Sequence, residues 1–249
     1  HVDRLDQGLG AELVAEKWGL SRRVLDEYAS RSHELSAQAI DRGDFESQVV
    51  PVDTESGVFA VDEGVRRGTT PEKLAGLEPS FREDGVIHAG NASQISDGAA
   101  AVMIMTSELA KQLGLHPIVR LVAGSVVGSD PVMMLTGPIP ATAKLLERTG
   151  LSIADIGAVE INEAFAPVPL AWQAEFDADP AVVNPLGGAI SVGHPLGASG
   201  AILTTRLIYH MRDRGIRYGV QAICEGGGTA NATLYELCLL YTSDAADDS

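Results

Sequence analysis

The chain has 249 residues, of which 45% are hydrophobic and 21% are charged, and its formal net charge is −16. This length allows one large domain or two small ones with a buried core. The negative charge argues against nucleic acid and anionic membranes as partners, and no apolar run is long enough for a transmembrane helix. Two widely separated cysteines provide neither a disulfide framework nor a C-x-x-C metal site, as expected of a reducing compartment. We expect a cytoplasmic protein, with targeting to another compartment left open.

The first 88 residues are predicted to be helical at first and loop-like later. Apolar residues spaced along one face predict a helix over residues 9–18. Ser21 is suited to cap a longer second helix that ends at Gly43. Glycines and prolines then interrupt every periodic run in residues 49–85, so this stretch is predicted to be a loop region.

The remainder of the chain is predicted to alternate between strands and helices, which indicates an α/β fold. Residues 99–106 predict a strand, and Ser107 begins a short helix. After Pro117, the predicted strands span 118–126, 158–161, 219–223 and 230–237, and the predicted helices span 141–149, 163–176 and 201–214.

The most informative motif is residues 224–228, Cys-Glu-Gly-Gly-Gly, which directly follows a predicted buried strand. Open α/β sheets place their sites at such strand ends. Glycine has no Cβ, so the backbone N–H groups of this turn can approach a substrate carbonyl beside the Cys224 thiol. The motif therefore suits acyl chemistry, although a buried structural cysteine before a glycine turn is an alternative.

A second motif places His194 between Gly193 and Pro195 within a glycine-rich stretch. Pro195 restricts His194 to an extended or turn conformation, and an amphipathic helix is predicted to begin near Ser199. His194 therefore lies on a fixed loop ahead of a helix, although a histidine of the surface or core is the alternative. The glycine spacing matches neither a dinucleotide-binding motif nor a P-loop.

A third motif, residues 162–166 (Asn-Glu-Ala-Phe-Ala), follows the apolar run 156–161, where a strand turns into a helix. Asn162 can cap that helix, or its amide can hold a water or a substrate oxygen. The sequence leaves both interpretations open.

In this order and at these separations, the three motifs resemble those of the thiolase family, the acetyl-CoA C-acyltransferases. Residues 90–100 and 136–141 support the resemblance, which covers nearly all of residues 1–237. It implies a thiolase-like fold with a loop domain that binds coenzyme A at residues 1–88. It further implies a remnant of the N-terminal half at 89–116 and a C-terminal half at 117–237, whose mixed five-stranded sheet lies between helices.

The resemblance also implies a missing part. Thiolases carry the acyl group on a cysteine of their first half, and neither Cys224 nor Cys238 occupies that position. We therefore expect an N-terminally truncated chain that does not complete a turnover alone. Residues 238–249 resemble a translated sequencing adapter, and a genuine acidic tail is the alternative.

The catalytic roles implied by the resemblance fall on four residues. His194 deprotonates the nucleophilic cysteine, and Cys224 is the acid and base at the α-carbon of the second substrate. Sulfur suits this work because nearby cationic or dipolar groups can lower a thiol pKa towards neutrality. Asn162, through a water, forms one oxyanion hole with His194, and the Gly226 N–H contributes to the other.

The resemblance further implies acyl-CoA substrates, no metal, no permanently bound cofactor, and a homodimer or homotetramer when the protein is complete. Arg66 matches an arginine near the adenosine phosphate of coenzyme A, although Arg66 and Arg67 as a solvated surface pair are the alternative. Six further positions match the lining of the pantetheine channel: Leu77, Phe81, Ala89, Ser93, Ala164 and Phe165.

Two other functions remain as hypotheses. A β-ketoacyl synthase-like enzyme shares the fold but uses two histidines, whereas this chain offers His194 and Cys224. A non-catalytic acyl-CoA-binding protein would follow if the nucleophilic cysteine were absent from the parent gene. One departure from the common thiolase pattern, Pro-Val-Pro at residues 167–169, leaves the preferred acyl length open.

Overall fold

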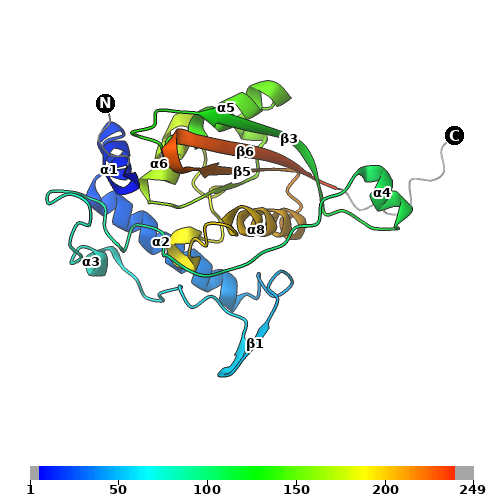
Figure 1. Ribbon diagram of the computed structural model, residues 1–249, viewed down its shortest axis with the longest axis horizontal. Helices are drawn as coiled ribbons and strands as arrows, with labels where there is room; N and C mark the ends of the chain where they lie inside the picture. Colours follow the sequence, from blue (N-terminus) through cyan, green and yellow to red (C-terminus); the bar gives the residue numbers. More distant parts are fainter. Residues whose placement is uncertain (1–5, 239–249) are drawn as a thin grey trace.

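The computed structural model describes residues 6–238, which form a four-stranded sheet with helices on both faces (Figure 1). The strands are β3 (Val119–Gly128), β4 (Ala158–Ile161), β5 (Tyr218–Cys224) and β6 (Thr229–Leu237). Their order is β3-β6-β5-β4, with β4 and β5 parallel and the other neighbours antiparallel. The predicted mixed α/β architecture is therefore confirmed.

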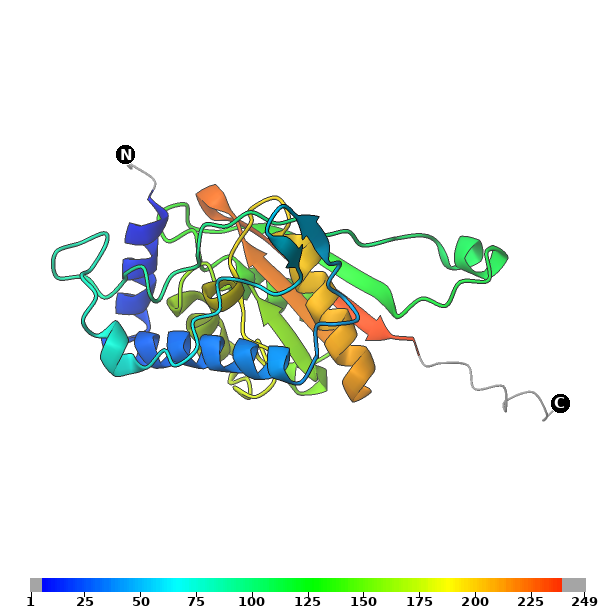
Figure 2. The same ribbon diagram turned by 90° about the horizontal axis from the view of Figure 1, so that it is seen from below.

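The two faces of the sheet are covered by different helices, as Figures 1 and 2 show. Helix α5 (Pro138–Thr149) shares one core with Val220 and Ala222 of β5. Helix α8 (Ser199–Arg214) covers the opposite face, where a Cβ on Gly219 would lie 2.4 Å from the Met211 sulfur. A glycine in β5 thus lets α8 approach the sheet closely.

The predicted N-terminal helices are confirmed as α1 (Gln7–Lys17) and α2 (Arg22–Asp41). The Ser21 hydroxyl caps α2 by accepting a hydrogen bond from the Val24 N–H. Helix α1 packs against α6 (Pro167–Phe176), and α2 packs against the short helices α3 (Pro71–Leu74) and α7 (Ala189–Val192). Helix α2 therefore lies beside the segment that leads to His194.

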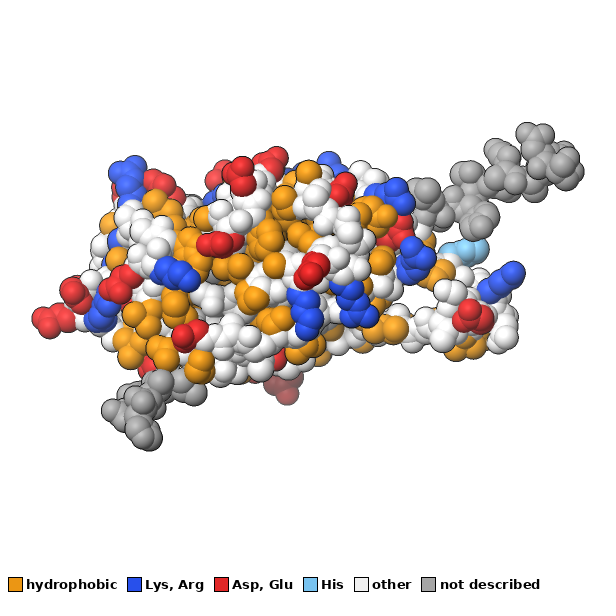
Figure 3. Space-filling view, turned by 90° about the horizontal axis from the view of Figure 1, so that it is seen from above, with side chains coloured by type: hydrophobic (Ala, Val, Ile, Leu, Met, Phe, Trp, Pro, Cys, Tyr) orange, Lys and Arg blue, Asp and Glu red, His pale blue; other side chains and the backbone are white. Residues whose placement is uncertain are grey.

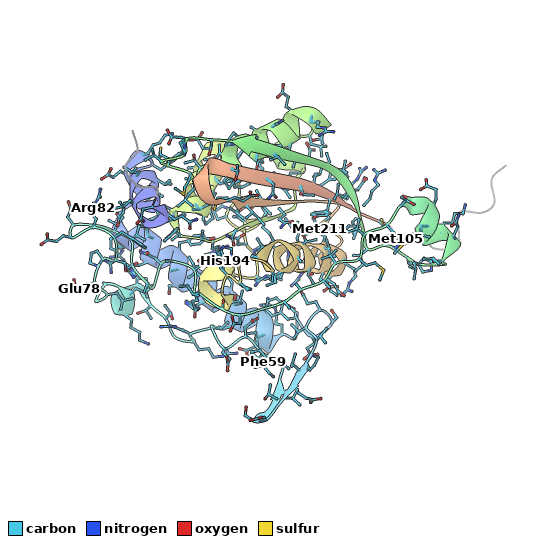
Figure 4. All side chains as sticks on the ribbon, in the orientation of Figure 1. Phe59, Glu78, Arg82, Met105, His194 and Met211 are labelled. Carbon is cyan, nitrogen blue, oxygen red and sulfur yellow. The ribbon has the colours of Figure 1, made fainter. Side chains whose placement is uncertain are left out.

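Two segments project from this body in Figure 1. One is the hairpin of β1 (Val52–Thr54) and β2 (Gly57–Phe59), which lies in the predicted loop region; Phe59 marks it in Figure 4. The other is α4 (Ser107–Gln112), the helix predicted from Ser107. The short elements η1 (Ile153–Asp155) and η2 (Gly226–Gly228) precede β4 and β6.

The predicted strand at residues 99–106 is wrong. This stretch pairs with no strand among residues 6–238, and its Met103 and Ile104 side chains are 81% and 77% exposed. Its apolar composition favours an extended chain, but a strand also requires a neighbour that satisfies its N–H and C=O groups.

Among residues 6–238 this sheet has four strands rather than the five that the resemblance implies, and a single parallel bridge joins Val159 of β4 to Val183. Asn184 adopts a left-handed conformation with φ of 46°, and the following Pro185 has no N–H to donate, so pairing ends there. The helix predicted from residue 163 begins instead at Pro167, which suits the first turn of a helix.

The predicted boundaries at residues 88 and 116 remain predictions. An antiparallel bridge joins Ala92 to Phe165, so residues on the two sides of the second boundary are in contact. Within residues 6–238 no helix is both long and apolar enough to cross a membrane. Most of the proposed adapter-derived tail, residues 239–249, lies outside the described residues.

Candidate active site

The three motifs meet at one edge of the sheet. Because β4 and β5 are parallel, their carboxyl ends lie at the same edge of the sheet. Asn162 directly follows β4 and Cys224 is the last residue of β5, and the Asn162 N–H donates to the Ala222 carbonyl at 3.1 Å. His194 reaches this edge from the loop between α7 and α8 and lies near the centre of Figure 4. The predicted convergence of Asn162 and His194 is present in the structure.

His194 is held by contacts to both ring nitrogens. The Ser199 hydroxyl donates to the Pro195 carbonyl at 3.0 Å, so its oxygen accepts from Nδ1 of His194, which lies 2.6 Å away. Nε2 then carries the lone pair and faces the Asn162 amide nitrogen at 3.4 Å. Burial lowers the pKa of His194 below its ordinary value, so the ring is neutral at pH 7.

The backbone before His194 requires glycine. Gly193 has a φ of 96°, and a Cβ there would lie 2.0 Å from the Ser96 hydroxyl oxygen. The His194 N–H donates to the Gln94 carbonyl at 3.0 Å. Residues 94–96 therefore pack against this loop and hold it by a backbone hydrogen bond.

Cys224 is 8% exposed at the end of β5. Burial raises the pKa of its thiol to about 12, and the neighbouring Glu225 raises it further, although a backbone hydrogen bond opposes the shift. Desolvation therefore outweighs the dipolar contribution that can lower a thiol pKa. The sulfur is a thiol at neutral pH, which is the acid form of the proposed proton carrier.

The glycine turn after Cys224 is fixed by backbone conformation at two positions and by lack of space at Gly228. Gly227 and Gly228 have φ values of 77° and 90°, and a Cβ on Gly228 would lie 2.8 Å from the Ser129 carbonyl oxygen. Gly226 itself is exposed, and the nearest atom to a Cβ there is the Gln7 amide nitrogen at 3.8 Å. Backbone at residue 226 is thus open to a substrate.

The residues predicted to bind coenzyme A fall into two groups. Arg66, Leu77 and Ala89 line a cavity of about 130 Å³, together with His33 and other residues. This volume holds only part of a ligand as large as coenzyme A. A wider, open hollow of about 420 Å³ lies between residues 96–100 and 195–198.

The second group forms a strip beside the first. The Ser93 N–H donates to the Ala164 carbonyl at 2.9 Å, and the Phe81 and Phe165 rings meet edge to face with centroids 5.9 Å apart. Of the six positions predicted to line the pantetheine channel, four lie in this strip, and Leu77 and Ala89 line the cavity.

The two arginines of the loop region differ in their environments. Arg67 binds the Asp41 carboxylate through two hydrogen bonds of 2.7 and 2.8 Å. Within residues 6–238, the exposed Arg66 guanidinium forms no ion pair, while its backbone N–H donates to Nδ1 of His33 at 3.1 Å. Arg66 is thus the cation that remains available to a phosphate.

Several polar residues of the site were not predicted from the sequence. Ser199 fixes the His194 ring, Gln94 holds the His194 loop, and Glu163 accepts four hydrogen bonds behind Asn162. The position of Ser199, five residues after His194 where a helix begins, is the one local sequence feature that indicates such a role. Gln94 and Glu163 act through contacts between distant segments.

Comparison with known proteins identifies the family. Residues 2–108 match the thiolase N-terminal domain, and residues 115–237 match the thiolase C-terminal domain. Together the two domains account for nearly the whole chain, which therefore belongs to the thiolase family.

Among curated relatives, steroid 3-ketoacyl-CoA thiolase FadA6 of Mycobacterium tuberculosis is 53% identical over 232 residues, covering 93% of this chain and 56% of that protein. The 3-ketoacyl-CoA thiolase of Bacillus subtilis is 44% identical over 247 residues, covering 94% of this chain and 63% of that protein. The chain thus spans less than two thirds of the length of either relative.

Solved structures confirm the thiolase fold. The acetyl-CoA acetyltransferase of Bacillus anthracis superposes with a TM-score of 0.91 at 42% identity, covering 95% of this chain and 61% of that one. Human mitochondrial 3-ketoacyl-CoA thiolase, solved in complex with CoA, gives a TM-score of 0.92 at 40% identity, covering 94% and 61%.

Proposed function

We propose that this chain provides the proton-transfer and oxyanion-binding part of an acyl-CoA C-acyltransferase. The reaction is the reversible Claisen condensation of an acyl-CoA with acetyl-CoA, or the thiolytic cleavage of a 3-ketoacyl-CoA. The observation that carries the proposal is the 3.4 Å approach of the Asn162 amide to His194 Nε2, at the sheet edge where β5 ends in Cys224. The 3-ketoacyl-CoA thiolases among the relatives support the same reaction class.

The proposed first role of His194 is that of a base. Its Nε2 lone pair, fixed by the Nδ1 contact to Ser199, can take the proton of a nucleophilic thiol, which then attacks an acyl-CoA carbonyl. Neither Cys224 nor Cys238 is proposed as that thiol. Once protonated, Nε2 becomes a donor and, together with the Asn162 amide and a water, can stabilise a thioester oxygen that gains negative charge.

The proposed role of Cys224 is proton transfer at the α-carbon. In thiolysis, the nucleophilic thiolate first adds to the β-carbonyl carbon. The bond from that carbon to the α-carbon then breaks, so the acyl group stays on the nucleophile as a thioester and the electron pair leaves on the α-carbon as an enolate. The Cys224 thiol gives its proton to that carbon, and the exposed Gly226 backbone can donate to the enolate oxygen. In condensation the step runs in reverse and requires Cys224 as the thiolate, the form it has after giving up its proton, which takes the proton of the α-carbon.

The proposed coenzyme A site extends from this edge to Arg66. The cavity of about 130 Å³ is suited to one section of a pantetheine arm, and the exposed Arg66 guanidinium offers a permanent cation for the phosphate. The human mitochondrial 3-ketoacyl-CoA thiolase was solved in complex with CoA, and this similarity supports the substrate class.

For the complete protein we propose a cytoplasmic homodimer or homotetramer. The free cysteines Cys224 and Cys238 are consistent with a reducing compartment. Exposed apolar side chains on β3, including Leu121 and Val126, offer surface for further protein contacts. Light scattering on the complete protein measures the number of subunits.

The function is tested by expressing the complete reading frame that contains this chain. We expect thiolysis of a 3-ketoacyl-CoA that requires free coenzyme A. Decarboxylation of a malonyl thioester without thiolysis would favour the β-ketoacyl synthase-like alternative. Binding of coenzyme A with neither reaction would indicate the non-catalytic alternative.

A further inference from the structure

A buried carboxylate that the proposed reaction does not use lies directly behind the site. Glu163 follows Asn162 and is 1% exposed. Its Oε1 accepts hydrogen bonds from the Tyr28 hydroxyl at 2.8 Å and the Asn184 amide at 3.1 Å. Its Oε2 accepts from the Ser32 hydroxyl at 2.7 Å and the Ile190 N–H at 3.1 Å. Both oxygens are therefore fully engaged with donors.

These donors come from three separate segments. Tyr28 and Ser32 belong to α2, Asn184 follows the Val183 bridge, and Ile190 belongs to α7. Asn184 also binds both backbone groups of Ile161, the last residue of β4, at 2.8 and 2.9 Å. The Glu163 cluster thus joins α2 and α7 to the end of the strand that carries Asn162.

The same cluster reaches His194 through the backbone. Ile190 lies four residues before His194, and Gln94 Nε2 donates to the Ile190 carbonyl at 2.9 Å. The His194 N–H in turn donates to the Gln94 carbonyl at 3.0 Å. A Cβ on Gly188 would lie 2.3 Å from the Glu163 carboxyl carbon, so glycine at this position leaves room for the carboxylate.

We propose that Glu163 is a positioning residue that sets the contact between Asn162 and His194 and couples it to the placement of α2. The inference rests on the proposed function, because that contact is the proposed active site. Glu163 acts through its neighbours and touches no reacting atom. Glu163→Gln keeps the side-chain volume but places an NH2 group against one hydroxyl, of Tyr28 or Ser32, and one N–H donor, of Asn184 or Ile190. The hydroxyl can turn and accept, but the N–H cannot, so Asn184 or α7 must move.

Two measurements test the role. In the complete enzyme, Glu163→Gln should lower kcat by about tenfold to 100-fold while KM changes by no more than about twofold, because misplacement of reacting groups acts on the chemical step. In the chain as it stands, histidine C2 hydrogen–deuterium exchange, read by mass spectrometry, should show a shifted titration midpoint for His194. The second measurement does not depend on acyltransferase activity.

Matched variants separate positioning from general destabilisation. Glu160→Gln changes an equally buried carboxyl on β4 that has no hydrogen-bond partner among the described residues, and it should leave kcat and the His194 midpoint unchanged. Gly188→Ala should reproduce the effects of Glu163→Gln, because its methyl group displaces the carboxylate. Tyr28→Phe and Ser32→Ala each remove one donor and should give smaller changes in the same direction, and they serve as the test if Glu163→Gln does not fold.

An unchanged His194 midpoint in Glu163→Gln and Gly188→Ala would overturn the proposal. So would a rise in KM as large as the fall in kcat, which would place Glu163 in substrate binding. A shifted midpoint in a protein without acyltransferase activity would support the positioning role and contradict the proposed function.

Discussion

At the residue scale, burial sets the protonation states of His194 and Cys224, the two proposed proton carriers. The pKa of His194 is lowered and that of Cys224 is raised, in both cases chiefly by desolvation. Burial disfavours the charged form of each group, so the imidazole is neutral and the sulfur carries a proton. A base and an acid therefore stand at the same sheet edge at neutral pH.

The lowered pKa of His194 predicts the acid side of the pH–rate profile. His194 acts as a base only when neutral, so activity should fall as pH drops through its folded pKa, below the ordinary value of 6.5. The measurement is kcat/KM for acyl transfer against pH. An acid limb centred above 6.5 would contradict this environment for His194.

Cys224→Ser should separate the two halves of the reaction. A serine hydroxyl is a far weaker acid than a thiol, so condensation and thiolysis should slow by about 10²-fold to 10⁴-fold. Acyl transfer to the nucleophile, measured as release of free coenzyme A in a burst, should remain. Unchanged condensation and thiolysis rates would exclude Cys224 from proton transfer.

Arg66→Ala tests the coenzyme A site, and Arg67→Ala is its matched control. Loss of a charge-assisted contact to phosphate should raise KM for coenzyme A thioesters by about tenfold. A pantetheine thioester that lacks the nucleotide should be unaffected. Arg67 already binds Asp41, so its replacement should change KM little. Equal weakening of both substrates by Arg66→Ala would instead place Arg66 in folding or acyl positioning.

At the element scale, local sequence features predicted most helices and strands. Ser21 caps α2 as expected, and the predicted strands at 158–161, 219–223 and 230–237 lie within or coincide with β4, β5 and β6. These elements carry their own caps or buried runs, so their signals are contained in short windows. The predicted strand at 99–106 failed because pairing depends on a neighbour that no local pattern reveals.

The same distinction applies to the site. The sequence singles out Asn162, His194 and Cys224 because each stands at the end of a predicted element, beside glycine, proline or a strand. Gln94 and Glu163 were missed because their partners lie far along the chain, in α2, α7 and the His194 loop. A single sequence contains no direct record of such contacts.

The unpaired stretch at residues 95–106 predicts self-association of the isolated chain. The Ile95 side chain is fully exposed, and the Met103 and Ile104 side chains are mostly exposed. Figure 3 shows further apolar side chains among the charged ones on the face seen from above. Unpaired extended backbone with apolar side chains favours aggregation. Light scattering should show concentration-dependent association that Met103→Glu combined with Ile104→Glu reduces. A soluble monomer that melts cooperatively without these changes would refute the prediction.

At the scale of the whole molecule, the carboxyl group of Glu160 is buried without a hydrogen-bond partner among the described residues, whereas polar side chains near α8 are hydrogen-bonded. Thr204 donates to the Gln221 side chain at 2.6 Å, but within residues 6–238 both oxygens of Glu160 and the Nε of Arg206 are buried without a hydrogen-bond partner. Burial raises the pKa of Glu160 to about 8, with Arg206 opposing the shift and Glu163 adding to it. Glu160 is therefore neutral in the folded chain at pH 7.

This protonation state makes global stability depend on pH. The folded pKa of Glu160, about 8, exceeds its ordinary value of 4.5, so the folded state holds a proton that the unfolded state releases. The stabilisation is fully present below pH 4.5 and is lost as pH rises towards and through 8, by about 1.4 kcal/mol for each pH unit between these values. Alkaline conditions should weaken the fold through this one group.

Glu160→Gln should remove that dependence, because the amide is neutral at every pH. Urea unfolding in the background of the Met103 and Ile104 substitutions, which limits association, gives the free energy of unfolding at pH 6 and pH 9. The free energy of unfolding of the Glu160→Gln variant minus that of the protein with Glu160 should be larger at pH 9 than at pH 6. Glu147→Gln, an exposed carboxyl on α5, should show no such change. If the free energy of unfolding changed equally with pH for Glu and Gln at position 160, Glu160 would ionise in the folded chain as it does in water. A water molecule or Arg206 would then stabilise the buried carboxylate.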